Sequence, residues 1–391
     1  MSEGKSTTFD GWLLGAVLML SAIGLIMVYS SSAILAHERT AGDSFYFLKK
    51  QVLAAGFGWL ALVLCLRLGY RKLARLAYPL LLLAIAFMVL VLIPGIGVKV
   101  GGAYRWMRLG GFSFQPSEFA KLVWVIYLAY SLAKKREKMR SFSIGFLPHL
   151  LISGLLVGLC MLEPDFGSSV ALLFVMFVML FAAGAKLSYL VGSVLLAIPF
   201  AYHAITSSPY RYQRMMSFLD PWANRQGAGY QVAESLMSIG SGGLWGLGLG
   251  EGRQKLFFLP EAHSDFVFAI LGEELGLLGV TLVVVLYAIV IWRGIHIALR
   301  ASEPFGCYLA LGITTLFAFH AVVNMSVVLG LLPTKGLTLP FISYGGSSLL
   351  VCLAATGLLL SVSVIPRKQT QRGGVEIRPS KHSAQAVEAP L

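Results

Sequence analysis

The feature that most constrains this chain is a succession of long apolar runs separated by short polar loops. A membrane-spanning helix needs about 20 consecutive apolar residues. Because the mean hydropathy is also high, at +0.78, we predict an all-α polytopic integral membrane protein with roughly ten transmembrane helices. The runs cover residues 12–33, 50–67, 75–94, 117–133, 143–162, 167–184, 188–205, 265–293, 305–330 and 347–365.

The polar segments divide the chain into three parts. Residues 1–11 form a short N-terminal segment, and residues 12–366 hold the predicted membrane domain. Its longest loop, between the seventh and eighth helices, covers about residues 206–263. Residues 367–391 are polar and contain glycine and glutamine, so we expect a disordered tail.

The net charge of +13 is distributed unevenly over the loops. Basic residues gather in alternate loops, and the positive-inside rule places those loops and both termini in the cytoplasm. The loop at 206–263 then faces outward. This pattern predicts a multi-pass membrane protein and favours membrane orientation over nucleic-acid binding. The residues are Arg67, Arg71, Lys72, Arg75, Lys134, Lys135, Arg136, Lys138, Arg140, Lys186, Arg293 and Arg300.

Asp265 marks the point where a polar loop passes into an apolar run. One interpretation is that Asp265 only caps this helix, which stabilises it by roughly 0.5–2 kcal/mol. Arg253, Lys255 and His263 precede it closely, although only 13% of the chain is charged. This concentration of titratable groups favours a functional carboxylate.

Charged residues also stand at the start of the fourth helix. Glu118 and Lys121 lie three residues apart and therefore share one helix face. They are either a capping glutamate with a helical ion pair, or groups facing a cavity, because exposing charge to lipid costs several kcal/mol. The preceding loop carries Arg105, Trp106 and Arg108, a basic aromatic patch suited to anionic headgroups.

The start of the last helix offers a candidate phosphate cradle. Ser343, Gly345, Gly346 and Ser347 precede or open this helix. Unpaired backbone N–H groups at a helix N-terminus favour anions, so these residues could contact a phosphate. Taken alone, this signal is weak.

Four segments together resemble the SEDS family (shape, elongation, division and sporulation) of bacterial cell-wall polymerases. They are GAYRWMRLGGFSFQPSEFAK, YQVAESLMSIGSGGLWGLGLG, RQKLFFLPEAHSDFVFAILGEELG and LPTKGLTLPFISYGGSS. The resemblance covers about residues 10–366, and residues 260–263 and 333–338 are more similar to the division branch than to the elongation branch. The chain departs from the family pattern at Glu234, Ser264 and Glu251–Gly252.

The resemblance implies a ten-helix peptidoglycan glycosyltransferase that polymerises lipid II. It implies as partners a class B penicillin-binding protein, which cross-links the product, and other division proteins at the septum. The family's catalytic aspartate corresponds to Asp265, its important Glu and Lys to Glu118 and Lys121, and its conserved Arg-Trp pair to Arg105 and Trp106.

Polymerisation of this kind needs one base and a group that neutralises a lipid pyrophosphate. The leaving group is weakly basic and needs no general acid, so a single carboxylate is enough. Asp265 would be this base. Candidates for the pyrophosphate are Lys121, Arg105, Arg108, Arg253, Lys255 and the helix start at Gly345–Gly346. No carboxylate cluster with metal-ligand spacing is present in the sequence, so it identifies no metal site and leaves open whether Mg²⁺ or Mn²⁺ assists.

Three alternatives remain open from the sequence. The intramembrane charges would also suit a polar path in a lipid II flippase. A non-catalytic scaffold for division proteins would leave Asp265 as a helix cap. The elongation polymerase of the same family is a third alternative.

The surroundings of Asp265 also predict how activity should depend on pH. We expect the helix N-terminus and nearby cations to hold the pKa of Asp265 near or below its usual value of about 4. Activity would then stay flat down to about pH 6. If His263 must be neutral, activity would instead fall around pH 6–7.

Overall fold

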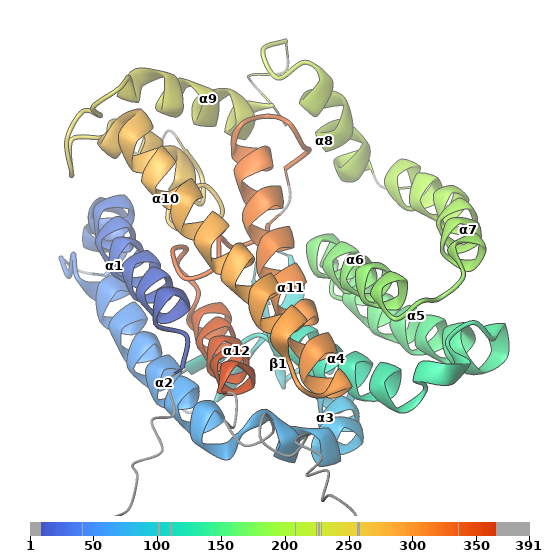
Figure 1. Cartoon of the computed structure of the whole chain (residues 1–391). Coiled ribbons are helices and arrows are strands. Elements are labelled where there is room, and N and C mark those ends of the chain that lie inside the picture. Colours follow the sequence, from blue (N-terminus) through green and yellow to red (C-terminus); the bar gives the residue numbers. More distant parts are fainter. Residues whose placement is uncertain are drawn as a thin grey trace, which may run out of the picture.

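The computed structural model describes residues 9–364 except 41, 101, 110, 111, 208, 224, 226, 228, 256–258 and 335. The predicted tail at 367–391 and most of the segment at 1–11 lie outside the described residues. The described part is mostly helical (Figure 1). Its helices are α1 (Gly11–Arg39), α2 (Tyr46–Leu68), α3 (Tyr70–Val91), α4 (Pro116–Lys134), α5 (Leu147–Leu162), α6 (Phe166–Ala182), α7 (Leu187–Thr206), α8 (Pro209–Leu219), α9 (Tyr230–Gly242), α10 (Val267–Arg300), α11 (Pro304–Val328) and α12 (Gly346–Ser363), with short turns at Arg136–Lys138 and Phe142–Phe146.

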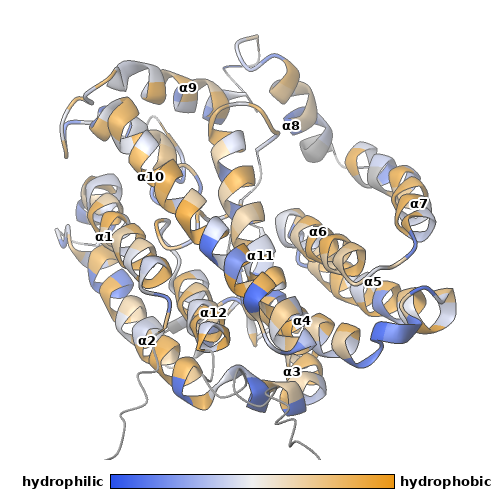
Figure 2. Cartoon of the chain, viewed as in Figure 1, coloured by the Kyte–Doolittle hydropathy of each residue, from blue (hydrophilic) through white to orange (hydrophobic). Residues whose placement is uncertain are grey.

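Seven of the described helical segments are long and apolar enough to cross a membrane. They are α1, α2, α3, Phe142–Leu162 (which contains α5), α10, α11 and α12. The apolar helix α6 and the apolar part of α7, Leu187–Phe200, are shorter than these spans. The helix α4 carries Glu118 and Lys121, which lower its hydropathy. Apolar residues predominate along the membrane helices in Figure 2. Each predicted run therefore coincides with a helix, and seven of these helices meet the length and hydropathy of a span.

The helices α4, α10, α11 and α12 form the centre of the bundle. α10 lies against α1, α9 and α11, and α12 packs along α2. A Cβ at Gly357 would lie only 2.3 Å from the carbonyl oxygen of Leu62, so glycine allows α12 to approach α2 closely. Small residues permit such close packing where lipid supplies no hydrophobic driving force.

A small sheet corrects the all-α prediction. The strands β1 (Gly97–Val100), β2 (Ala103–Leu109) and β3 (Phe112–Phe114) form an antiparallel sheet in the order β1-β2-β3. Met107 pairs with Gly97 on one side and with Phe114 on the other. Glycines bound the strands, but only the short strands β1 and β3 alternate apolar and polar residues. The sequence analysis interpreted this segment only as a basic aromatic loop.

The long loop at 206–263 folds back onto the helices. It contains α8 and α9, and α9 lies on α10 and α11. The hydroxyl of Ser235 donates to the carbonyl of Val328 at 2.7 Å, which fixes α9 against the end of α11.

The glycine-rich segment after α9 docks onto a break in α10. Gly276 has φ 64° inside α10, which interrupts the helix. The N–H groups of Leu247 and Gly248 donate to the carbonyls of Glu273 and Glu274, both at 3.0 Å. A Cβ at Gly276 would lie 2.3 Å from the Gly246 nitrogen. Glycine at these positions therefore allows the backbone of the segment after α9 to approach the backbone of α10 closely.

Candidate functional site

Asp265 does not cap α10. The N-cap residue is Phe266, and no side chain makes a capping hydrogen bond there. The backbone of Asp265 is fixed on both sides, because its N–H donates to the Glu261 carbonyl at 3.1 Å and its carbonyl accepts from Asn324 Nδ2 at 2.9 Å. The capping interpretation is therefore wrong, and the carboxylate is left for another role.

The segment before α12 lies against the Asp265 carboxylate. A Cβ at Gly336 would lie 3.1 Å from Asp265 Oδ2. Asn324 Nδ2 also donates to the Leu337 carbonyl at 2.7 Å, and the Tyr344 N–H donates to the His263 carbonyl at 2.9 Å. These bonds join the start of α10 to the residue 336–344 segment, so that the carboxylate faces its glycine.

We expect Gly336→Ala to slow any reaction at Asp265 by about tenfold, because small misplacements at a reacting group are costly. The methyl group would sit at the edge of contact with Oδ2, where only the glycine now leaves space. Initial rates at saturating substrate would measure the effect, with the thermal midpoint as a control for folding. An unchanged rate would show that this side of the carboxylate is not used.

Burial raises the pKa of Asp265 to about 7. Glu261 and Asp165 raise this pKa further, whereas Arg214 and Arg105 lower it. Among the described residues, no side chain donates a hydrogen bond or forms an ion pair to this carboxylate. The predicted pKa near 4 is therefore contradicted, because desolvation outweighs the cations.

Asp265→Asn should stabilise the fold at pH 8 but not at pH 4. With a folded pKa raised to about 7 from 3.8, the folded protein keeps a proton that the unfolded chain releases as pH rises through this window. The ionised Asp265 carboxylate therefore lowers the free energy of unfolding of the wild-type protein. This loss grows from pH 4 to pH 7 and stays constant above pH 7. It amounts to up to about 4 kcal/mol, a value that screening by residual solvent contact reduces. Thermal midpoints in detergent at both pH values would measure it. An equal change at both would contradict the raised pKa.

Arg105 reaches the site from strand β2. Its Nε donates to the Glu163 carbonyl at 2.8 Å and its Nη2 to the Pro164 carbonyl at 2.5 Å, in the turn between α5 and α6. Successive side chains of a strand point to opposite faces, so Trp106 lies on the other face of β2. The structure therefore brings Arg105, but not Trp106, towards Asp265.

Asp165 connects this turn to α4 and α6. It caps α6 by accepting from the Ser168 N–H at 3.0 Å. Its other oxygen accepts from the Ser117 hydroxyl at 3.1 Å. The α5–α6 turn, the start of α4 and β2 are thus held together on one side of the site.

Arg214 is a site residue that the sequence analysis missed. It lies on α8 and donates from Nη1 to the Thr334 carbonyl at 3.5 Å. Its charge lowers the pKa of Asp265. No local pattern around Arg214 could have shown this, because only the folding of the 206–263 loop brings α8 back to the segment before α12.

Glu118 and Lys121 form a closed ion pair beneath the site. Lys121 Nζ lies 2.8 Å from Glu118 Oε1 and 3.1 Å from His320 Nε2. Lys121 is 2% exposed. His320 Nδ1 in turn lies 3.4 Å from the Thr338 carbonyl. The pair therefore contacts the residue 336–344 segment through His320 and does not line an open cavity.

Comparison with known proteins places this arrangement in a family. Residues 11–368 match the sequence profile of the cell cycle proteins that groups FtsW, RodA and SpoVE. The chain belongs to this family. The "Probable peptidoglycan glycosyltransferase FtsW" of Trichlorobacter lovleyi is 47% identical over 355 residues, which cover 91% of this chain and 93% of that protein.

Solved structures support the same assignment. A chain from a study of "Structural coordination of polymerization and crosslinking by a peptidoglycan synthase complex" is 32% identical, with a TM-score of 0.76, covering 91% of this chain and 98% of that one. The rod shape determining protein RodA of Thermus thermophilus is 31% identical, with a TM-score of 0.68, covering 92% and 98%. The SEDS resemblance is confirmed.

Of the cations expected to hold pyrophosphate in this SEDS protein, Lys255 pairs with α10 through its side chain, and Arg253 contacts α10 through its backbone. Lys255 Nζ lies 2.6 Å from Glu274 Oε1 and 3.0 Å from the Ser30 hydroxyl, with only 4% of its side chain exposed. The backbone N–H of Arg253 donates to Glu273 at 2.7 Å. The substrate-binding role of Lys255 stays a prediction, and Glu274 already neutralises its charge in this structure. Neither cation is among the charges that shift the pKa of Asp265.

The predicted phosphate cradle at α12 is largely occupied by the protein. The Gly345 N–H donates to Gln51 Oε1 at 3.3 Å, and the Ser347 hydroxyl donates to the Ser113 carbonyl at 3.0 Å. Ser343 is buried, and its hydroxyl accepts from the Leu339 N–H at 2.8 Å. Ser343, Gly345 and Ser347 therefore hold the segment before α12 in place, and Gly346 follows Gly345 at the helix start.

His263 lies in an aromatic pocket. Its ring centroid is 5.0 Å from that of Phe47 and 5.5 Å from that of Tyr344. Burial lowers the pKa of His263, so the imidazole is neutral at pH 7. It therefore positions the turn before Asp265 without adding charge.

Metal ligands do not cluster at this site. Within the ranges that the structure describes, no group of three or more His, Cys, Asp or Glu side chains could hold a metal ion.

Proposed function

We propose that this chain is a peptidoglycan glycosyltransferase that polymerises lipid II into glycan strands during septal wall synthesis. Its family and the glycosyltransferase named among its relatives support this activity. The observation that carries it is Asp265, a carboxylate without a partner among the described side chains, with the charges of Arg105 and Arg214 within electrostatic range.

The reaction requires one base and one group that stabilises the leaving anion. The acceptor hydroxyl oxygen attacks the anomeric carbon of the donor sugar, and the bond from that carbon to the pyrophosphate oxygen breaks. Asp265 takes the proton of the acceptor hydroxyl as the new bond forms. Attack from the side opposite the leaving group inverts the anomeric centre.

Arg105 and Arg214 are the cations best placed for the lipid pyrophosphate. Both act on Asp265 electrostatically. Two N–H groups of Arg105 are held by backbone carbonyls, so its guanidinium is fixed in advance and its remaining donors can bind phosphate oxygens. We assign Glu118 and Lys121 a positioning role, since they meet the site through His320 and Thr338.

Activity should fall tenfold per pH unit below about pH 7. Only the ionised carboxylate can accept the proton, and burial raises the pKa of Asp265 to about 7. Burial lowers the pKa of His263, and the proposed base is Asp265, so His263→Gln should leave this acid limb in place. The pH profile of single-turnover polymerisation measures both. A limb near pH 4, or one that disappears in His263→Gln, would contradict the assignment.

We propose a division role for this polymerase. Identity reaches 47% with a relative named FtsW but 31% with RodA of the elongation branch.

We further propose ten membrane spans, formed by α1–α7 and α10–α12, in the inner membrane. Both termini then face the cytoplasm, and Asp265 and the 206–263 loop lie on the outer side. A septal location follows from the division role.

The partner that we propose is a class B penicillin-binding protein. The similarity to a chain of a peptidoglycan synthase complex, in which polymerization and crosslinking are coordinated, supports such a pairing. One face of α10 is available for it, because Leu278, Leu282 and Val285 are each more than 40% exposed. We propose glycosyl transfer rather than transport, because Glu118 and Lys121, two of the charges that could line a transport path, are buried and paired with each other.

A further inference from the structure

A cavity lies at the far end of α6 from the proposed active site. α6 begins beside Asp165, and its 17 residues place the α6–α7 turn roughly 25 Å away. The cavity has a volume of about 490 Å³ and is lined by Arg140, Phe181, Gly184, Ala185, Lys186, Leu187 and Ser188. It is thus separate from the groups around Asp265.

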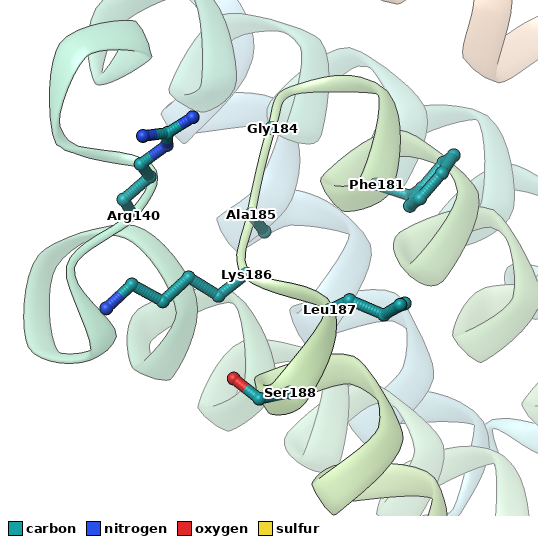
Figure 3. A pocket seen from close by; sticks show the side chains of 7 residues that line it. All are labelled: Arg140, Phe181, Gly184, Ala185, Lys186, Leu187 and Ser188. Atoms are coloured by element: carbon teal, nitrogen blue, oxygen red, sulfur yellow. The ribbon is translucent and has the colours of Figure 1, made fainter.

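Two cations from different segments face this cavity. Arg140 comes from the α4–α5 connection and Lys186 from the α6–α7 turn, and Figure 3 shows both side chains on the same side of that turn, with the Ser188 hydroxyl. Both are exposed. In the described part of the chain neither forms an ion pair. Their charges are therefore available to an anion.

Apolar side chains lie next to the cations along the same turn. Phe181 and Leu187 are 64% and 61% exposed and point away from the cations on the other side of the turn. Tyr189 lies 5.3 Å from Phe142 between ring centroids, and the Lys186 ammonium lies 5.6 Å from the Tyr189 ring. Aromatic rings beside cations, at the end of an apolar helix, are typical of the headgroup level of a membrane.

We propose that this cavity binds the phosphate headgroup of an anionic glycerophospholipid. Two unpaired cations neutralise the phosphate, and the exposed apolar surface that begins at Leu187 accepts the acyl chains. Basic pockets at the cytoplasmic ends of membrane helices bind such lipids. A free phosphate would use the cations but not the apolar surface. The site is independent of the glycosyl transfer at Asp265.

The test is lipid binding to the purified full-length chain in detergent. Native mass spectrometry with dioleoyl phosphatidylglycerol would compare wild type with Arg140→Gln/Lys186→Gln. We expect binding at least tenfold weaker in this double variant, at about 1 kcal/mol for each cation. The matched control is Lys134→Gln/Lys138→Gln, which removes the same charge from two exposed positions outside the cavity, one at the end of α4 and one on the α4–α5 connection, and should bind within twofold of wild type.

Three results would overturn the proposal. The first is equal affinity of the cavity double variant and wild type for dioleoyl phosphatidylglycerol. The second is binding of dioleoyl phosphatidylcholine as tight as that of dioleoyl phosphatidylglycerol. The third is full competition by millimolar inorganic phosphate, which would indicate a site for free anions. The thermal midpoint checks that each variant folds. If the double variant is unstable, Arg140→Gln and Lys186→Gln are measured singly, and each should weaken binding about fivefold.

Discussion

Lys121→Met should destabilise the protein by about 3–5 kcal/mol, because it leaves the buried Glu118 carboxylate without its partner. The lysine ammonium also contacts His320, which loses that contact in the variant. Thermal unfolding in detergent would show a fall of many degrees. From the sequence, the alternatives were a capping glutamate with a helical ion pair and groups that face a cavity. Because the pair is buried, its loss should cost more than the loss of an exposed helical pair.

A double-mutant cycle separates this explanation from a packing defect. Glu118→Gln/Lys121→Met removes both charges and should recover much of the lost stability, since replacing a buried ion pair by neutral groups is often close to neutral. Lys134→Met, on the exposed end of the same helix, should change stability by less than about 0.5 kcal/mol. Additive losses in the cycle would mean that the pair does not act as a unit.

Asp265→Asn should lower the rate of glycan polymerisation by at least about hundredfold, because a positioned general base contributes roughly 10²–10⁴. The amide keeps the shape of the side chain but cannot accept the proton. Rates of polymer formation from lipid II measure the loss. The protein should remain folded, and by the argument above should be more stable than wild type at pH 8.

Glu261→Gln is the matched control. Glu261 is exposed and lies four residues before Asp265, and its charge raises the pKa of Asp265. Its removal should preserve polymerisation and move the acid limb to lower pH. A loss as large as that in Asp265→Asn would assign the essential carboxylate to Glu261 instead.

Helix positions were predictable because apolar run length is a local property. Each predicted run is a helix in the structure, and Asp165 caps α6 as its place before the run indicates. The sheet β1–β3 was missed because its strands are three to seven residues long. Strands this short leave little periodicity to detect.

The roles of cations near Asp265 were not predictable from sequence distance. Lys255 is only ten residues from Asp265, yet its ammonium pairs with Glu274, next to the break at Gly276 where the glycine-rich segment docks. Arg214 is much farther along the chain but acts on Asp265 through the folded 206–263 loop. The pKa of Asp265 was misjudged for the same reason, since its burial depends on distant segments that the sequence does not place.

The most direct test of the central claim is glycan synthesis from lipid II by the purified chain in detergent at pH 8. Wild type should convert lipid II into polymer under single-turnover conditions, and Asp265→Asn should yield none above background. Polymer from Asp265→Asn at the wild-type rate would contradict the assignment of the base. If the folded wild-type protein made no polymer either alone or with its transpeptidase partner, the proposed activity itself would be contradicted.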